Sequence, residues 1–189
     1  MTPVPAVALD WSVDRAAGIA ALVLASLSVA VGILSAAGPG LGRALVPRGL
    51  GADGRGLHEA LALATLAAIF IHVLAFATDP FFAVGTAAAL VPFASPVRTL
   101  EVGIGQVAAY GIAALGLAYY ARGRIGAARW RRAHRWIATF WALAALHTFL
   151  AGSDVDRVWF AVAVLPPVFA VLVALGLHWL ERMDAAART

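Results

Sequence analysis

The sequence predicts an all-α integral membrane protein, a bundle of five transmembrane helices with the N-terminus outside and the C-terminus in the cytoplasm. Of its 189 residues, 62% are hydrophobic and 13% are charged, whereas soluble domains have roughly 45 to 50% and about 25%. Five apolar stretches come near the roughly 20 residues that a helix needs to cross the hydrocarbon core. All 14 basic residues are arginine, and most of them fall on one side of these stretches. Such a chain has the lipid bilayer as its first partner and offers no soluble surface for nucleic acid.

The apolar stretches define one transmembrane domain, residues 1–189, and set the bounds of each expected span. The expected spans are 16–37, 57–78, 102–121, 136–151 and 158–180. We expect the first span to be retained, because Asp10 and Asp14 precede it in place of a basic region and its apolar run is longer than that of a secretory signal.

Residues 80–96, between the second and third spans, are apolar but are not expected to cross the membrane. Pro80 and Pro96 bracket the segment and Pro92 interrupts it. Proline removes a backbone donor and breaks a helix. We therefore expect an interfacial or re-entrant segment here.

The arginines predict the orientation. With five crossings, Arg15, Arg98 and Arg157 fall on one side of the membrane. The other side collects Arg43, Arg48, Arg55, Arg122, Arg124, Arg129, Arg131, Arg132, Arg135, Arg182 and Arg188. Short loops rich in arginine stay in the cytoplasm, so the sequence predicts a multi-pass protein of the cell membrane with its C-terminus inside. A sixth crossing through 80–96 would place the cluster at 122–135 outside.

Every histidine falls within or at the edge of an expected span, at positions 58, 72, 134, 147 and 178. An ionisable side chain is costly in the bilayer and marks a functional site by default. His58 and His72 are 14 residues apart, which gives about 21 Å of rise and about 40° of rotation on one helix. His134 and His147 are 13 residues apart, which gives about 20 Å of rise.

Spans two and four run in the same direction, so depth pairs His58 with His134 on the inner side and His72 with His147 on the outer side. A straight helix turns by about 220° over 13 residues, so the fourth span does not present both of its histidines on one face. Either His134 precedes the regular helix, or the two bound groups approach that helix from different sides. His178 lies four residues before Arg182 and competes as the inner ligand.

Two facing imidazoles favour haem over zinc. Zinc sites have four ligands, or three and water, usually with carboxylate or thiolate company, whereas this chain has no cysteine and only Glu59 lies near a pair. Haem iron needs axial ligands in an apolar pocket. The small residues of the second span leave room for a flat macrocycle, and arginines at the membrane edges could pair with its propionates.

The two histidine pairs, with the runs LVPFASPVRTLEVGIG and ARWRRAHRWIATFWALAALHTFLAG, resemble the ferric reductase-like transmembrane domain. This family includes ferric reductases, NADPH oxidases and the haem subunit of bacterial methionine sulfoxide reductase systems. The resemblance covers about residues 57–180. It implies two haem b groups, the inner one bound by His58 and His134 and the outer one by His72 and His147.

The resemblance also assigns roles to two further residues. Phe140 matches a position where the family often places an aromatic side chain between the haems, and Arg98 is expected near the edge of the outer haem. The chain has no G-x-G-x-x-G fingerprint in a strand-to-helix setting, so we expect no FAD or NAD(P) site within it. The electron donor would then be a separate cytoplasmic flavoprotein or a quinol.

We therefore expect a di-haem b electron-transfer protein that passes electrons to an acceptor at the outer face, such as ferric iron, oxygen, a quinone or a periplasmic reductase. It would be a component of an oxidoreductase, and the sequence assigns no catalytic residue. One alternative is a small histidine-dependent proton or metal transporter, which the lack of an inverted repeat or a chain of buried acids disfavours. Another is a structural membrane subunit without a cofactor.

Overall fold

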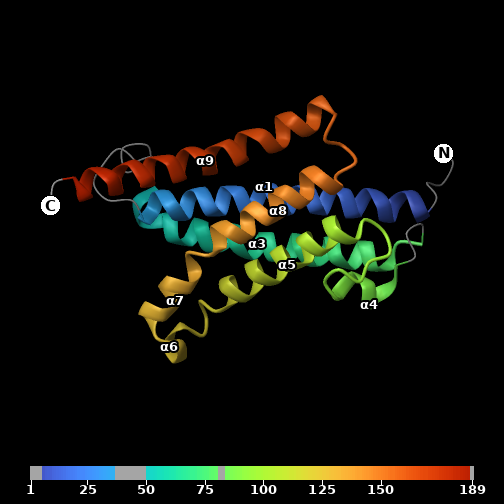
Figure 1. Ribbon diagram of the computed structural model, residues 1–189, viewed down its shortest axis with the longest axis horizontal. Helices are drawn as coiled ribbons and strands as arrows, with labels where there is room; N and C mark the ends of the chain where they lie inside the picture. Colours follow the sequence, from blue (N-terminus) through green and yellow to red (C-terminus); the bar gives the residue numbers. More distant parts are fainter. Residues whose placement is uncertain (1–5, 37–49, 81–83, 188–189) are drawn as a thin grey trace.

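The computed structural model describes residues 6–36, 50–80 and 84–187, and within these ranges every regular element is a helix (Figure 1). The long helices are α1 (Ala6–Ala36), α3 (Leu50–Thr78), α5 (Thr99–Leu117), α8 (Ile137–Ala151) and α9 (Val158–Ala186). The short helices are α4 (Gly85–Leu90), α6 (Arg122–Ile125) and α7 (Ala127–His134). The start of α1 and the end of α9 lie at opposite ends of the bundle (Figure 1).

Four helices of the described chain are long and apolar enough to cross a membrane. They are Trp11–Ala36, Gly54–Thr78, Thr99–Leu117 and Val158–Ala186. The expected fourth span forms α8, which is apolar but has only 15 residues and so rises about 22 Å, short of a hydrocarbon core of about 30 Å. The fold is that of a helical, multi-pass membrane protein, and the fifth crossing depends on α8.

The helices differ from the expected spans mainly at their ends. α1 begins at Ala6, α3 begins at Leu50 and α9 continues to Ala186, because a helix extends into polar residues that a count of apolar residues leaves out. α5 begins and ends earlier than expected, after Arg98 with φ 45° and ψ 53° in the left-handed region. Four residues that bear on the predicted spans and orientation lie outside the described residues: Ala37, Arg43, Arg48 and Arg188.

α1 is the central helix and packs against α3, α8 and α9, while α5 packs against α8. Small residues such as Ala25 and Ala145 allow the helices to approach closely, as in membrane bundles that lack a hydrophobic driving force between helices. The buried indole of Trp141 donates from Nε1 to Ser26 Oγ at 2.9 Å, and Ser26 Oγ donates to the Leu22 carbonyl. This bond joins α8 to α1 inside the bundle.

Residues 80–96, the segment expected at the interface, contain α4 and are hydrogen-bonded to α5. Gln106 is buried on α5, and its Nε2 donates to the carbonyls of Ala88 and Ala89 at 2.9 and 2.8 Å. Its Oε1 accepts from the backbone N–H of Phe93 at 3.2 Å. α4 has six residues, too few to cross the membrane. Residues 81–83 of the segment lie outside the described chain.

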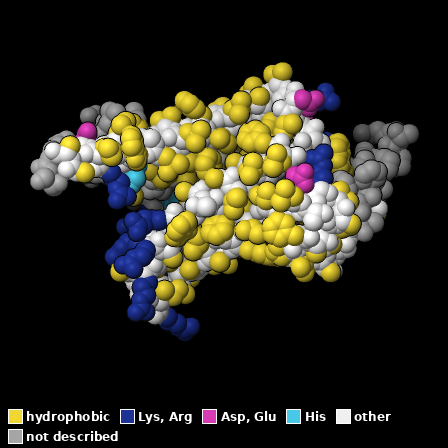
Figure 2. Space-filling model, viewed as in Figure 1, with side chains coloured by type: hydrophobic (Ala, Val, Ile, Leu, Met, Phe, Trp, Pro, Cys, Tyr) yellow, Lys and Arg dark blue, Asp and Glu magenta, His cyan; other side chains and the backbone are white. Residues whose placement is uncertain are grey.

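Charge is distributed unequally between the two ends of the bundle. Figure 2 shows arginine side chains gathered over α6 and α7, next to a face that is largely hydrophobic. The described arginines at this end are Arg55, Arg122, Arg124, Arg129, Arg131, Arg132, Arg135 and Arg182. At the other end Arg15, Arg98 and Arg157 are accompanied by several acidic residues, among them Asp154 and Asp156.

Candidate functional site

Four of the five histidines form two facing pairs. The ring centroids of His58 and His134 are 6.1 Å apart, and those of His72 and His147 are 6.3 Å apart. α3 contributes one histidine to each pair, while the partners come from two different helices. α7 ends at His134 and α8 begins at Ile137, so a break separates His134 from the helix that carries His147. The rotation of about 220° holds for one straight helix, whereas these two histidines belong to separate helices.

In all four histidines Nδ1 lies at hydrogen-bond distance from a backbone carbonyl of a neighbouring helix. The distances are 2.8 Å for His58 and Ser28 O, 3.0 Å for His72 and Asp14 O, 3.3 Å for His134 and Leu115 O, and 2.7 Å for His147 and Glu101 O. A carbonyl can only accept, so each Nδ1 carries a proton, and in the neutral imidazole Nε2 then keeps the lone pair. In the neutral ring this is a tautomer and an outer hydrogen bond typical of metal-binding histidines.

The separation of the rings fits a metal ion between two Nε2 atoms. Two metal–nitrogen bonds of about 2.0 to 2.1 Å on one line place the ring centroids roughly 6.3 Å apart. The observed separations are 6.1 and 6.3 Å. Among the described residues no group of three or more histidines and acidic residues is placed to hold a metal. Each pair therefore offers two imidazoles, and a metal ion held there would have to bring its other ligands with it.

The accepting carbonyls repeat at one interval on two helices. Asp14 and Ser28 on α1 are 14 residues apart, and so are Glu101 and Leu115 on α5. Fourteen residues correspond to about 21 Å of rise and about 40° of rotation, which matches the interval between His58 and His72 on α3. α1 thus fixes both histidines of α3, and α5 fixes the histidines of α7 and α8.

Glycine follows three of the four carbonyls by four residues, at Gly18, Gly32 and Gly105. A Cβ at Gly18 or Gly32 would lie 3.0 Å from the His72 or His58 ring, and at Gly105 it would lie 2.6 Å from the His147 ring. In a helix the N–H of residue i+4 bonds the carbonyl of residue i, so a side chain there would cover that carbonyl. Glycine leaves it open to the imidazole.

Each pair lines a cavity. The cavity at His72 and His147, called the outer cavity after the predicted orientation, has a volume of about 340 Å³, is mostly apolar, and includes Arg98 in its wall. The inner cavity, of about 50 Å³, includes His58 and His134. Ala25 and Ile112 line both cavities, so these two residues separate the two sites inside the bundle.

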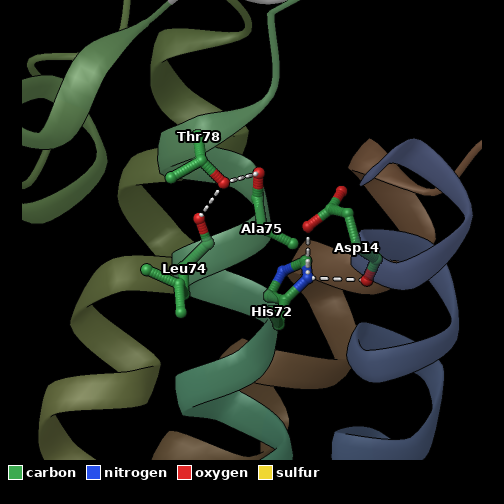
Figure 3. A network of polar contacts seen from close by, with 5 residues as sticks. All are labelled: Asp14, His72, Leu74, Ala75 and Thr78. Carbon is green, nitrogen blue, oxygen red and sulfur yellow. Dashed lines mark hydrogen bonds and ion pairs between the residues drawn. The ribbon is translucent and has the colours of Figure 1, made fainter. Parts of the chain in front are cut away.

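Charged groups surround the outer pair. Asp14 Oδ1 lies 2.8 Å from His72 Nδ1, and Figure 3 shows both oxygens of Asp14, carboxylate and carbonyl, turned toward this ring. Arg15 Nε donates to Asp154 Oδ2 at 2.7 Å and joins α1 to the turn before α9. Arg98 Nη1 donates to the Leu150 carbonyl at 3.0 Å, at the end of α8. Arg98 thus lies at the mouth of the cavity that holds the outer pair.

Aromatic groups surround the inner pair. Trp130 stacks on His134, with ring centroids 5.0 Å apart and planes at 29°, and Tyr119 packs against Trp130. The exposed hydroxyl of Tyr120 donates to Glu59 Oε1 at 2.8 Å. This hydrogen bond to a carboxylate raises the pKa of Tyr120 above its ordinary value of 10.0.

Two other predicted site residues are not members of the pairs. Phe140 packs over Gly111, where a Cβ would overlap the ring, and it is not in the wall of either cavity. His178 lies on α9, which packs against α1, and within the described chain it makes no ring contact with His58 or His134. The role of Phe140 between two haems stays a prediction.

Sequence reasoning missed the partners of the histidines. A backbone carbonyl has no sequence signature, and the role of Asp14 and Ser28 depends on how α1 packs against α3. The glycines did carry a signal, because Gly18 and Gly32 repeat the interval of 14 residues between His58 and His72.

No protein-family model, curated protein or solved structure matches this chain. The resemblance to the ferric reductase-like domain therefore stays a prediction that depends on the histidine pattern. The chemistry of the two pairs is the basis on which a function can be argued.

Proposed function

We propose that the protein is a di-haem b membrane protein that carries electrons from a cytoplasmic or membrane donor to an acceptor at the outer face. The observation that carries this proposal is the set of four histidines in two facing pairs, each with Nδ1 held by a backbone carbonyl. Four imidazoles in this arrangement support a functional site, because an ionisable side chain is costly in an apolar, membrane-spanning bundle.

The donor set favours haem over a bare metal ion. Each pair could supply two imidazole nitrogens to a haem iron, and the macrocycle would bring the remaining ligands itself. The outer cavity of about 340 Å³ falls within the usual range of ligand pockets, about 300 to 1,000 Å³. The inner cavity of about 50 Å³ is smaller, so a macrocycle there requires its lining side chains to move apart.

The remaining groups have distinct tasks in this proposal. Haem, when bound, supplies one-electron chemistry at iron. His58 and His134 would hold the inner group, His72 and His147 the outer one, and Arg98 could pair with a carboxylate of the outer group. The arginines of α6 and α7 favour the cytoplasm for the inner end, so a separate flavoprotein or quinol would deliver electrons on that side. The acceptor would meet the outer end.

A reduced-minus-oxidised spectrum and a pyridine haemochrome assay on detergent-purified protein test the proposal. We expect two b-type haems per chain after expression with an ample haem supply. The variant His178→Ala is a matched control and should keep both haems. Protein that folds and contains no haem would overturn the proposal and favour a transporter, which liposome assays of proton or metal movement would detect.

A further inference from the structure

The two pairs differ in the side chain that α1 places beside the histidine of α3. At the inner pair, Ser28 Oγ lies 3.1 Å from His58 Nδ1 and donates to the His58 carbonyl at 3.3 Å. At the outer pair, Asp14 Oδ1 lies 2.8 Å from His72 Nδ1. The backbone contact is the same in both, so the local difference on α1 is a carboxylate in place of a hydroxyl.

The Asp14 carboxylate is close to the imidazole and has little else to neutralise it. Its Oδ1 is buried, and the contact recorded for it among the described residues is the one with His72 Nδ1, which also faces the Asp14 carbonyl. The neighbouring cations are engaged elsewhere, Arg15 with Asp154 and Arg98 with the carbonyl of Leu150. The Asp14 carboxylate is turned toward the His72 ring (Figure 3).

A negative charge beside Nδ1 increases the electron density that the imidazole presents at Nε2. A more basic axial ligand stabilises iron in its higher oxidation state, and so does the charge itself across a medium of low dielectric constant. Both effects lower the reduction potential of a haem held by that histidine. A neutral hydroxyl, as at Ser28, has no comparable effect.

We propose that Asp14 is a positioning residue that lowers the reduction potential of the outer haem below the value it would have beside a neutral partner. This inference rests on the proposed function, since it concerns the group that His72 and His147 would hold. It makes the reduced outer site a stronger reductant toward its acceptor. α1 does not lower the reduction potential of the inner haem in this way, because position 28 is a serine.

Potentiometric titration of the purified holoprotein tests this with reciprocal variants. Asp14→Ser gives the outer pair the partner of the inner one, and Ser28→Asp does the reverse. We expect Asp14→Ser to raise one of the two midpoint potentials by at least about 59 mV. For one electron this shift corresponds to a tenfold change in the equilibrium constant for reduction. Ser28→Asp should lower the other potential. Asp14→Asn, which keeps the shape of the side chain without its charge, should behave like Asp14→Ser.

The outcomes separate this inference from the proposed function. Wild-type protein without haem overturns both. Wild-type protein with two haems whose potentials are unchanged in Asp14→Ser and Asp14→Asn overturns only the role of Asp14. If Asp14→Ser and Asp14→Asn both lose a haem, Ser28→Asp becomes the test. A carboxylate at position 28 that leaves the midpoint potential of the inner haem unchanged also overturns the inference. Haem content and melting temperature, measured for every variant, identify loss of structure.

Discussion

The outer histidine pair lies in a cavity of about 340 Å³ beside a carboxylate and an ion pair, whereas the inner pair lies in a cavity of about 50 Å³ beside stacked aromatic rings. Both pairs nevertheless use the same backbone contacts, with carbonyls of α1 and α5 holding the four imidazoles. The main chain thus repeats one framework at two depths, and the side chains around it differ.

This division has a physical reason. A carbonyl on a regular helix recurs on nearly the same face after 14 residues and does so whatever side chain is attached. Side chains at positions such as 14 and 28 are then free to set charge and volume separately at each end.

The largest effect is expected from removing one histidine of a pair. His72→Ala should remove one of the two haems and leave the other, and His58→Ala should remove the complementary one, because the pairs share no ligand. Haem per chain, measured by the haemochrome assay, should fall from two to one in each case. Loss of both haems from either variant would mean that the two sites do not fold independently.

The glycines under the rings should come next. Gly105→Ala places a Cβ 2.6 Å from the His147 ring, closer than the 3.0 Å contact that Gly32→Ala makes with His58. Overpacking of this kind costs about 1 to 3 kcal/mol, so Gly105→Ala should weaken haem retention at the outer pair more than Gly32→Ala does at the inner pair. Haem loss during graded heating, followed by absorbance, measures both. Equal loss would show that the rings shift freely.

The ion pair at the outer end provides a third, smaller effect. Asp154 is buried, and its loss leaves Arg15 without its carboxylate. Asp154→Ala should therefore lower the free energy of unfolding by about 1 to 3 kcal/mol. Thermal unfolding in detergent checks this, with Asp156→Ala as the control on an exposed acid of the same turn. A control variant as destabilised as Asp154→Ala would contradict it.

The smallest effect is expected at the inner end, where the corresponding link is exposed. The carboxylate of Glu59 accepts from the Tyr120 hydroxyl and raises the pKa of that tyrosine. Glu59→Gln should lower the pKa of Tyr120, because the neutral amide favours the phenol less and repels the phenolate less. Absorbance of tyrosinate during an alkaline titration measures the change. In wild-type protein this contact stabilises the fold below pH of about 10 and is lost as the pH rises further.

Much of the fold could be predicted because apolar length and arginine placement depend on local sequence. The prediction failed where a helix extends beyond its apolar run, as α3 does by beginning at Leu50. It also did not give the length of α8, whose 15 residues are fewer than a full crossing needs. The break after His134 could be foreseen only as one of two alternatives, since nothing in the run of arginines fixes where α7 must end.

The arrangement of the histidines could also be predicted, because depth follows from residue count along a helix. His58 lies beside His134 and His72 beside His147, as the depths required; their role as ligands stays a prediction. The Asp14 carboxylate could not have been assigned to His72, because that contact depends on which face of α1 packs against α3.

The interval of 14 residues has a consequence for how the chain can change in length. Fourteen residues complete almost four turns, so the two histidines of α3 meet the same side of α1. One residue inserted between His58 and His72 would lengthen that helix by only about 1.5 Å but would turn one imidazole by about 100°. A single substitution between the two histidines keeps both imidazoles facing the carbonyls of α1. An insertion or deletion there would keep both contacts only if α1 changed in length by the same number of residues.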